Sequence, residues 1–195
     1  MLFAHGSGSS RRSPRNRLVA DALHGAGIGT LLFDLLTEQE SRDRRNVFAV
    51  DLLAERLNQA RAWLDAELGP GARSLGFFGA STGAAAALVA AANYPPVSAI
   101  VSRGGRPDLA GEALQRVTVP TLLIVGGADY DVLALNEAAL ARMRCVRQLV
   151  VVPGATHLFE EPGALERVAA LARDWFVTHL KGQVALAAGG ARLSR

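Results

Sequence analysis

The stretch GFFGASTGAAAALVAAA, residues 76–92, decides how this chain folds. An aromatic, apolar run leads into its centre and an alanine-rich run leads out, so a buried strand passes directly into a buried helix. At the junction, Gly79-Ala80-Ser81-Thr82-Gly83 fits the pattern G-x-S-x-G. A serine on such a sharp turn adopts a strained backbone that lifts its Oγ above the sheet, and side chains two positions away would collide. The stretch therefore predicts a nucleophile at Ser81, with a closely packed glycine turn as the structural alternative.

Short apolar runs alternate with longer amphipathic runs along the rest of the chain. The apolar runs are nearly continuous in hydrophobicity, as in parallel strands that are covered on both faces. Strands are predicted at 2–5, 30–36, 74–79, 97–102, 121–127 and 147–154, with a polar loop at 37–46. Helices are predicted from Ser13-Pro14, over 47–68, after Ser81, over 132–143 and from about 160. This order predicts an α/β fold, a doubly wound and mostly parallel sheet with helices on both faces.

Length and composition indicate one soluble globular domain. The chain has 195 residues, of which 50% are hydrophobic and 20% charged. We expect the domain to span residues 1–180 and the tail 181–195 to be flexible. The single cysteine, Cys145, excludes an internal disulfide and suits a reducing cytoplasm, where we expect the protein to work. The sequence contains neither an apolar run of about 20 residues, the length of a membrane span, nor the order of a secretory signal.

The charge distribution gives little support to a polyanionic partner. The net charge is +3, and the basic residues that cluster at 11–17, RRSPRNR, have no aromatic residues between them. This arrangement favours a solvated helix start over a nucleic-acid surface. Zinc-binding spacings are absent, so we expect no metal. The charge pattern and the lack of a long apolar run predict no nucleic-acid and no membrane partner. The sequence leaves a homo-oligomer open.

Two further residues complete a candidate catalytic set with Ser81. A serine nucleophile needs a base, and the base needs a carboxylate that orients it. His157 follows the last predicted strand, and Asp129 follows the strand before it. Because the carboxyl ends of parallel strands share one edge of the sheet, the three side chains should emerge together. Asp131 is the alternative acid, but Asp129 directly follows the glycine turn and is preferred.

The turn after the first predicted strand supplies the remaining part of the candidate site. It reads His5-Gly6-Ser7-Gly8. The backbone N–H groups of Ser7 and Thr82 are predicted to form an oxyanion hole. His5 is interpreted as a structural hydrogen-bonding residue, and His24 and His179 as satisfied or exposed residues of helices.

Four separated motifs, in this order, resemble those of an α/β-hydrolase of the dienelactone hydrolase-like group. They are His5-Gly6, Gly79–Gly83, GGADYDV at 126–132 and PGATHLFEEP at 153–162, and the similarity spans about residues 1–180. The resemblance implies hydrolysis of a small-molecule carboxylic ester or lactone without a cofactor. The dienelactone hydrolases proper carry a cysteine nucleophile, whereas this chain has Ser81. The fold also implies two strands ahead of the one at 2–5, which this sequence is expected to lack. Either the true start lies upstream, or this is a shortened form in which 30–36 forms an exposed edge.

Arginines on the same edge are candidates for substrate binding. The segment SRGGRPD, 102–108, follows the strand after the nucleophile helix and carries Arg103 and Arg106. Their guanidinium groups are predicted to bind a carboxylate or phosphate of the substrate. The alternative is local pairing with Asp108 or Glu112, which would only shape the loop.

Two other functional classes compete with the hydrolase. Gly6, Gly8 and Asp34 mimic a dinucleotide-binding fingerprint, but Arg11 occupies the third glycine position. That hypothesis also leaves Ser81, Asp129 and His157 without a role. A non-catalytic relative that uses the fold for binding is the second competitor.

Overall fold

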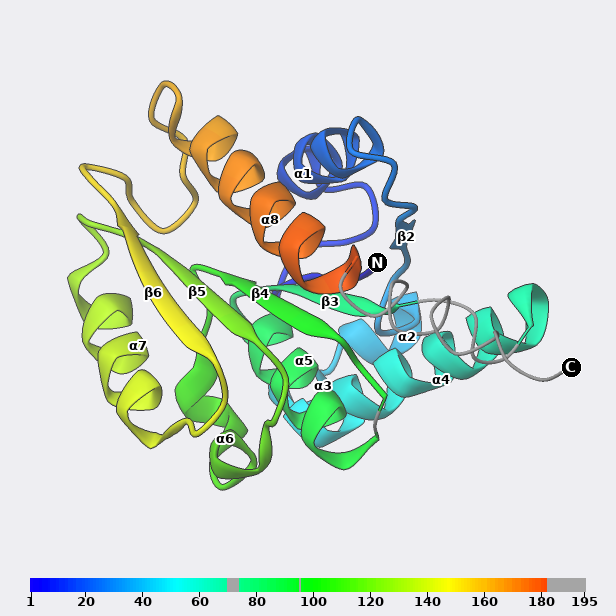
Figure 1. The fold of residues 1–195 in the computed structure, drawn as a ribbon. Helices are drawn as coiled ribbons and strands as arrows, with labels where there is room; N and C mark the ends of the chain where they lie inside the picture. Colours follow the sequence, from blue (N-terminus) through cyan, green and yellow to red (C-terminus); the bar gives the residue numbers. More distant parts are fainter. Residues whose placement is uncertain (70–73, 95, 182–195) are drawn as a thin grey trace, which may run out of the picture.

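One parallel sheet forms the centre of the molecule. The computed structural model describes residues 1–69, 74–94 and 96–181. Within these ranges, six strands pair in the order β2-β1-β3-β4-β5-β6, every pair parallel. Helices cover both faces of the sheet (Figure 1). The predicted α/β class and the mostly parallel, doubly wound sheet are confirmed, whereas the tail predicted to be flexible lies, from residue 182 on, outside the described residues.

Strands and helices alternate along the chain, so every strand runs in the same direction. The strands are β1 (Leu2–Ala4), β2 (Leu31–Leu32), β3 (Gly76–Ala80), β4 (Ala99–Arg103), β5 (Thr121–Gly126) and β6 (Arg147–Val152). The helices are α1 (Pro14–His24), α2 (Glu38–Ser41), α3 (Arg44–Phe48), α4 (Val50–Leu68), α5 (Thr82–Asn93), α6 (Ala113–Arg116), α7 (Tyr130–Arg142) and α8 (Ala164–Lys181), with a 3-10 turn η1 (Pro107–Ala110). The carboxyl ends of all six strands therefore meet at one edge.

The sheet divides the core into two layers. Consecutive residues of a strand point to opposite faces, so Phe77 packs on the side of α4 and α5 and Phe78 on the side of α1 and α8. Both phenylalanines are fully buried, which contributes about 1.5–3 kcal/mol each. Helix α5 packs against the sheet between α4 and η1, and ten of its residues are buried. Its small alanine side chains allow this close approach. These two packed layers hold the strands in place, and with them the carboxyl edge of the sheet that carries the candidate site.

The strand predicted at 30–36 is much shorter than expected. Only Leu31 and Leu32 pair with β1, at the edge of the sheet. Beyond them the chain leaves the ladder, because the N–H of Leu35 donates to His5 Nε2 at 3.1 Å and Asp34 pairs with Arg11. The predicted edge position is therefore confirmed, but the predicted length is wrong, and Leu35 is buried instead.

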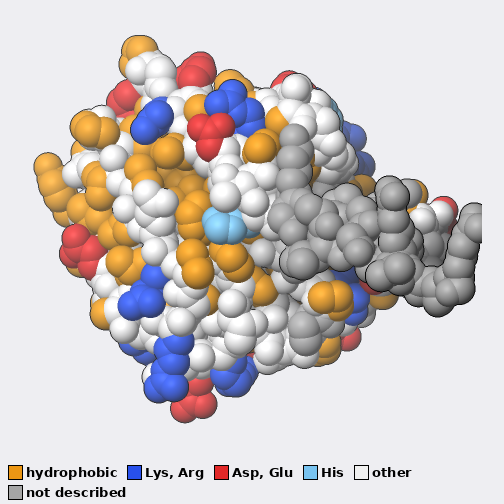
Figure 2. Space-filling model, in the orientation of Figure 1, with side chains coloured by type: hydrophobic (Ala, Val, Ile, Leu, Met, Phe, Trp, Pro, Cys, Tyr) orange, Lys and Arg blue, Asp and Glu red, His pale blue; other side chains and the backbone are white. Residues whose placement is uncertain are grey.

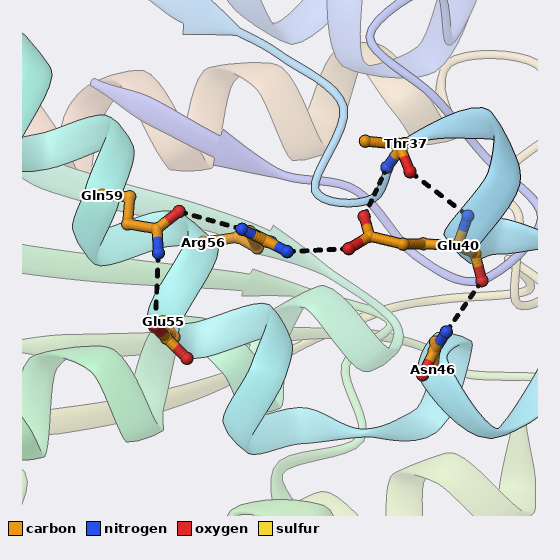
Figure 3. A network of polar contacts seen from close by, with 6 residues as sticks. All are labelled: Thr37, Glu40, Asn46, Glu55, Arg56 and Gln59. Carbon is orange, nitrogen blue, oxygen red and sulfur yellow. Dashed lines mark hydrogen bonds and ion pairs between the residues drawn. The ribbon is translucent and has the colours of Figure 1, made fainter.

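The predicted polar loop at 37–46 contains two short helices, α2 and α3 (Figure 3). Thr37 caps α2: its Oγ accepts from the N–H of Glu40, and the Glu40 carboxylate accepts from the N–H of Thr37. The same carboxylate accepts from Arg56 Nη2 on α4 at 2.7 Å. Helix α4 consequently begins at Val50 rather than 47. A reciprocal cap and one ion pair hold this segment against α4.

Strand β6 forms the other edge of the sheet. Val151 in this strand is 40% exposed, and Val146 before it is 63% exposed. Figure 2 shows hydrophobic side chains gathered on the side of the molecule where β6 lies.

No helix in the described part of the chain is long and apolar enough to cross a membrane.

Candidate active site

Ser81 lies at the junction of β3 and α5 in a rare backbone conformation. Its φ and ψ are 51° and −122°, outside the regions that L-residues prefer. Its N–H donates to the carbonyl of Arg103 at 3.3 Å, and its own carbonyl accepts from the N–H of Arg106 at 3.1 Å. A strained residue persists only where its surroundings fix it, and here β4 and the loop after it do so.

The glycines on either side of Ser81 are required by close backbone contacts. A Cβ on Gly79 would lie 2.4 Å from Ala84 Cα, and one on Gly83 would lie 2.1 Å from the carbonyl oxygen of Ala4. Because both contacts are with backbone atoms, neither can be relieved by moving a side chain. The spacing G-x-S-x-G therefore follows from the approach of α5 to β1 and β3.

His157 and Asp129 contact each other beyond the carboxyl ends of β6 and β5, the strands that they follow. His157 Nδ1 lies 2.7 Å from Asp129 Oδ2, and the Asp129 side chain is only 15% exposed. The loop that carries His157 crosses β5 closely, since a Cβ on Gly126 would lie 2.3 Å from the carbonyl oxygen of Ala155. Asp131, the alternative acid, is exposed on α7 and makes no contact with His157 in the described part of the chain. An Nδ1–H bond to Asp129 leaves Nε2 of His157 as a proton acceptor.

The three predicted catalytic residues thus emerge at the same edge of the sheet, but not all of them touch. Among the described residues, no hydrogen bond joins Ser81 to His157. The segment 103–106 contacts both residues. The carbonyl of Arg103 and the N–H of Arg106 bond to Ser81, and a Cβ on Gly104 would lie 3.1 Å from the carbonyl oxygen of His157. Hydrogen bonds of this kind are often long in the absence of substrate and shorten when it binds.

The two predicted oxyanion-hole residues lie next to each other, with one difference from the expectation. The N–H of Ser7 donates to the hydroxyl of Thr82 at 3.0 Å, so this donor is already engaged. Thr82 is buried and opens α5, where the first backbone N–H groups have no partner within the helix. A Cβ on Gly6 would lie 2.9 Å from Ser81 Cβ, so the loop after β1 packs directly against the serine.

His5 has a structural position. The N–H of Leu35 donates to its Nε2 at 3.1 Å, which leaves Nδ1 to donate to the carbonyl of Gly6 at 3.0 Å. With both ring nitrogens engaged, His5 joins the loop after β1 to the segment after β2. This agrees with its interpretation as a hydrogen-bonding residue rather than a second base.

A cleft of about 790 Å³ adjoins the oxyanion-hole residues. It lies between the loop after β1 and the segment 34–41, and it includes Ser7 and Thr82 but neither Ser81 nor His157. One wall is formed by α2, which the Thr37–Glu40 cap and the Glu40–Arg56 pair hold in place (Figure 3). No cluster of histidines, cysteines and carboxylates that could hold a metal occurs within the described ranges.

The two arginines predicted to bind substrate have different surroundings. Arg106 donates from Nε and Nη2 to Asp108 at 2.9 and 2.8 Å, the local pairing that the sequence left open. Arg103, the last residue of β4, is buried, and its Nε and Nη1 have no hydrogen-bond partner among the described residues. The structure therefore separates a paired, half-buried arginine from an unpaired, buried one.

Asn136 on α7 supports the nucleophile turn, a position that the sequence analysis missed. Its Nδ2 donates to the carbonyl of Gly105 at 2.9 Å and to that of Val132 at 2.8 Å, and its side chain is fully buried. Gly105 precedes Arg106, whose N–H bonds to the carbonyl of Ser81. The available signal was a polar residue on the buried stripe formed by Val132 and Ala139.

Comparison with known proteins identifies the family. No family model matches the sequence. The fold superposes on the crystal structure of dienelactone hydrolase from Anabaena variabilis with a TM-score of 0.88 and 56% sequence identity, over 92% of this chain and 85% of that one. The chain belongs to the dienelactone hydrolase-like α/β-hydrolases. The resemblance found from four sequence motifs is thereby confirmed.

One further solved structure and one curated relative extend the comparison for this dienelactone hydrolase-like chain. Est1E from Butyrivibrio proteoclasticus shares the fold at 15% identity, with a TM-score of 0.75 over 91% of this chain and 86% of that one. A Mycobacterium tuberculosis protein named as a candidate phosphoribosyl transferase is 61% identical over 183 residues. These residues are 93% of this chain but 41% of that relative, so the chain spans less than half the length of this curated relative.

In this fold, the residues that the dinucleotide hypothesis requires are engaged in another contact. Asp34, its candidate ribose ligand, forms an ion pair with Arg11 and also accepts from the N–H of Arg11 at 2.7 Å. Arg11 is the residue that stands where the fingerprint needs a third glycine. The family assignment and this ion pair both favour the hydrolase interpretation.

Proposed function

We propose that this chain hydrolyses a carboxylic ester or lactone of a small molecule through an acyl-enzyme on Ser81. The observation that carries the proposal is the strained turn of Ser81 at the edge where Asp129 contacts His157 at 2.7 Å. Membership in a family that includes a dienelactone hydrolase supports the reaction class. No cofactor is required for this chemistry.

Each residue has a defined task in the proposed reaction. Ser81 Oγ attacks the carbonyl carbon while His157 Nε2 accepts its proton, and His157 then returns the proton to the departing alkoxide. Asp129 accepts the Nδ1–H bond, holds the ring in this tautomer and stabilises its charged form. A water molecule that His157 activates releases the acyl group and restores Ser81. A lactone gives one product because its alkoxide stays attached to the acyl part.

The negative charge of the tetrahedral intermediate would be held by the N–H groups of Thr82 and Ser7. One donor of this type is worth about 2.7–4 kcal/mol in other enzymes. The Ser7 N–H can take part only if its bond to the Thr82 hydroxyl is shared or exchanged for one to the substrate. The N-terminus of α5 adds a positive partial charge at the same point.

The cleft beside Ser7 and Thr82 is the proposed place for the part of the substrate that does not react. Its volume of about 790 Å³ suits a small molecule. The phosphoribosyl transferase named among the relatives is not proposed as the activity, because the chain matches 41% of that protein.

Cys145 is not proposed as the nucleophile despite the cysteine of the dienelactone hydrolases proper. It lies just before β6, where its Sγ is 3.9 Å from the hydroxyl of Thr121, the first residue of β5. This is the amino end of the strands, opposite the candidate site. Burial raises the pKa of its thiol, which disfavours the reactive thiolate.

Labelling with a fluorophosphonate probe tests the proposal directly. The probe should modify the chain once, and peptide mapping should find the adduct on Ser81. Ser81→Ala should abolish labelling, whereas Asp129→Asn should slow it strongly. A chain that neither reacts with the probe nor hydrolyses short p-nitrophenyl esters would be the non-catalytic relative considered above.

A further inference from the structure

His157 lies in the loop 153–163, which joins β6 to α8 and is called the histidine loop below. On the side of β6 the main chain fixes this loop. The carbonyl of Ala155 accepts from the N–H of Ala128 at 2.9 Å, next to Asp129. This bond comes before His157 in the loop, so the imidazole also needs support from the side of α8.

A strained turn surrounds His157. The N–H of Phe159 donates to the carbonyl of Thr156 at 3.2 Å, which closes a turn with His157 inside it. Phe159 is buried in the layer of α1 and α8, and its φ is 56°, a value that a non-glycine residue keeps only where its surroundings enforce it. The turn lies against the segment that bonds to Ser81, because a Cβ on Gly104 would be 3.4 Å from Phe159 Cε2. A shift of this turn would therefore move His157 relative to Ser81.

One side-chain bond closes the same turn from outside. Thr156 Oγ donates to Glu161 Oε1 at 2.6 Å, a length typical of a hydroxyl bonded to a carboxylate. The bond from the Thr156 hydroxyl, and after it bonds from backbone groups of both residues, lower the pKa of Glu161 below its ordinary value of 4.5. The carbonyl of Glu161 accepts from the N–H of Ala164, the first residue of α8, at 3.0 Å. Glu161 thus joins the turn to the start of α8.

The neighbouring carboxylate, Glu160, has different contacts. Its side chain is 65% exposed and pairs with Arg15 at 3.3 Å. Glu161 pairs with no cation in the described part of the chain, and its second oxygen, Oε2, is buried without a hydrogen-bond partner there. A carboxylate that is partly kept from water and lacks a cation depends on the bonds of its other oxygen. Thr156 is therefore the main partner of Glu161.

We infer that Glu161 is a positioning residue for the proposed base. Its bond to Thr156 closes the turn, which keeps the imidazole of His157 in contact with Asp129 and at the edge that carries Ser81. The assignment rests on the proposed function, because the position of the imidazole affects the rate only if His157 transfers the proton. A displacement of about 1 Å can lower a rate about a hundredfold, and the loss of one partly exposed bond should have a smaller effect, about tenfold.

The first test measures the hydrolysis of short p-nitrophenyl esters. Glu161→Ala and Thr156→Val should each lower kcat about tenfold and leave KM within about twofold, because neither residue lines the cleft proposed for the substrate. The double variant should be no slower than either single variant, since both changes remove the same bond. Glu161→Gln should recover most of the rate, because its amide oxygen also accepts from Thr156. Glu160→Ala is the matched control and should keep the rate of the unaltered chain.

The second test needs no hydrolysis. The Nδ1–H of His157, bonded to Asp129, should give a proton NMR signal at low field that His157→Gln removes. Glu161→Ala should weaken this signal through faster exchange with solvent, whereas Glu161→Gln and Glu160→Ala should retain it. If the unaltered chain cleaves no ester, the proposed function fails, and the signal still decides whether Glu161 holds the imidazole.

Urea unfolding separates a positioning role from a general loss of structure, because rates and spectra are then compared where each variant is folded. If Glu161→Ala does not fold, Thr156→Val carries both tests, since valine has nearly the shape of threonine. Three results would each overturn the inference: an unchanged kcat in an active chain, an unchanged Nδ1–H signal, or a loss that Glu161→Gln does not restore.

Discussion

The nucleophile turn (residues 79–83) and the cleft wall (residues 34–48) border the same edge of the sheet but are held by different forces. In the turn, Gly83 packs against the backbone of Ala4 and Ser81 is fixed by main-chain hydrogen bonds. In the wall, the side chains of Thr37, Glu40 and Arg56 form the contacts, and they are partly or largely exposed (Figure 3). Few residue types therefore fit at the positions of the turn, whereas side chains of the wall can be substituted without moving the backbone.

The difference implies separate roles for the two regions. Backbone contacts in a buried setting fix atoms to the precision that bond-making requires. Exposed ion pairs contribute little and are screened by salt, so they shape a surface without defining one geometry. We therefore expect changes in the turn to act on the rate or on folding, and changes in the wall to act on substrate affinity.

The strongest test of the comparison is Ser81→Ala. Loss of the nucleophile should lower ester hydrolysis by a factor on the order of 10⁴ or more, while the fold survives because alanine is the smaller residue. Rates on short p-nitrophenyl esters measure this. Cys145→Ala is the matched control and should keep full activity. Near-normal turnover by Ser81→Ala would remove the catalytic role from the turn.

Gly83→Ala should act on folding rather than on rate. The added Cβ would lie 2.1 Å from the carbonyl oxygen of Ala4, a clash with backbone that only a shift of α5 or β1 can relieve. We expect a loss of about 3 kcal/mol or more in the free energy of unfolding, at the upper end for overpacking. Urea unfolding measures it.

Gly25→Ala provides the contrast for this test. Gly25 has φ −58°, and a Cβ there would come no closer than 3.6 Å to its neighbours. Such a change should be neutral or stabilising by up to about 1 kcal/mol. Similar losses in both variants would mean that the turn is no more constrained than an ordinary helix end.

The sequence predicted the turn better than the wall, for a physical reason. The turn is local: Gly79, Ser81 and Gly83 lie within five residues, and their pattern encodes the close approach of strand and helix. The wall depends on where the chain leaves β2, which is decided by His5 and Arg11 from a distant segment. No periodicity within 30–36 carries that information. The signal that was available, Thr37 followed by Glu40 as a reciprocal cap, marks the start of α2.

The supporting residues of the site were harder still to predict. Asn136 is one polar residue on a buried helix stripe, and only the fold shows that its amide reaches Gly105. The burial of Arg103 was not predictable from its glycine-rich surroundings, since burial depends on segments that are distant in the sequence. Asp129 and His157, by contrast, could be predicted from the order of the strands. Each follows a parallel strand, and the carboxyl ends of such strands share one edge of the sheet.

Asn136→Ala should reveal how far support for the turn extends. The change leaves the carbonyl of Gly105 without its partner and a small cavity in α7, which should lower the free energy of unfolding by about 1–3 kcal/mol. Because Gly105 adjoins the residue that bonds to Ser81, kcat should fall about tenfold while KM changes little. Steady-state kinetics and urea unfolding together measure this. Asn93→Ala, exposed at the end of α5, is the control. A loss of stability with unchanged kcat would limit Asn136 to packing.

The smallest expected effect concerns the wall and its dependence on pH. Backbone and side-chain hydrogen bonds from Thr37, and then Arg56, lower the pKa of Glu40 below its ordinary value of 4.5. A carboxyl group whose pKa is lower in the folded state stabilises the fold fully above its unfolded pKa, and this stabilisation disappears as pH falls through the folded pKa. Glu40→Gln should therefore be slightly less stable than the unaltered chain at pH 7.

That difference should shrink as the pH falls below about 4.5, the window set by the ordinary pKa of Glu40. Urea unfolding of both proteins between pH 7 and pH 3 measures the difference, and the titration of every other carboxylate cancels in the comparison. At neutral pH, Glu40→Gln should raise KM by at most about fivefold and leave kcat unchanged, because an exposed ion pair contributes little. A gap in stability that stays constant across the pH range would mean that Glu40 acts through packing. A fall in kcat would mean that the wall, like the turn, positions the reacting atoms.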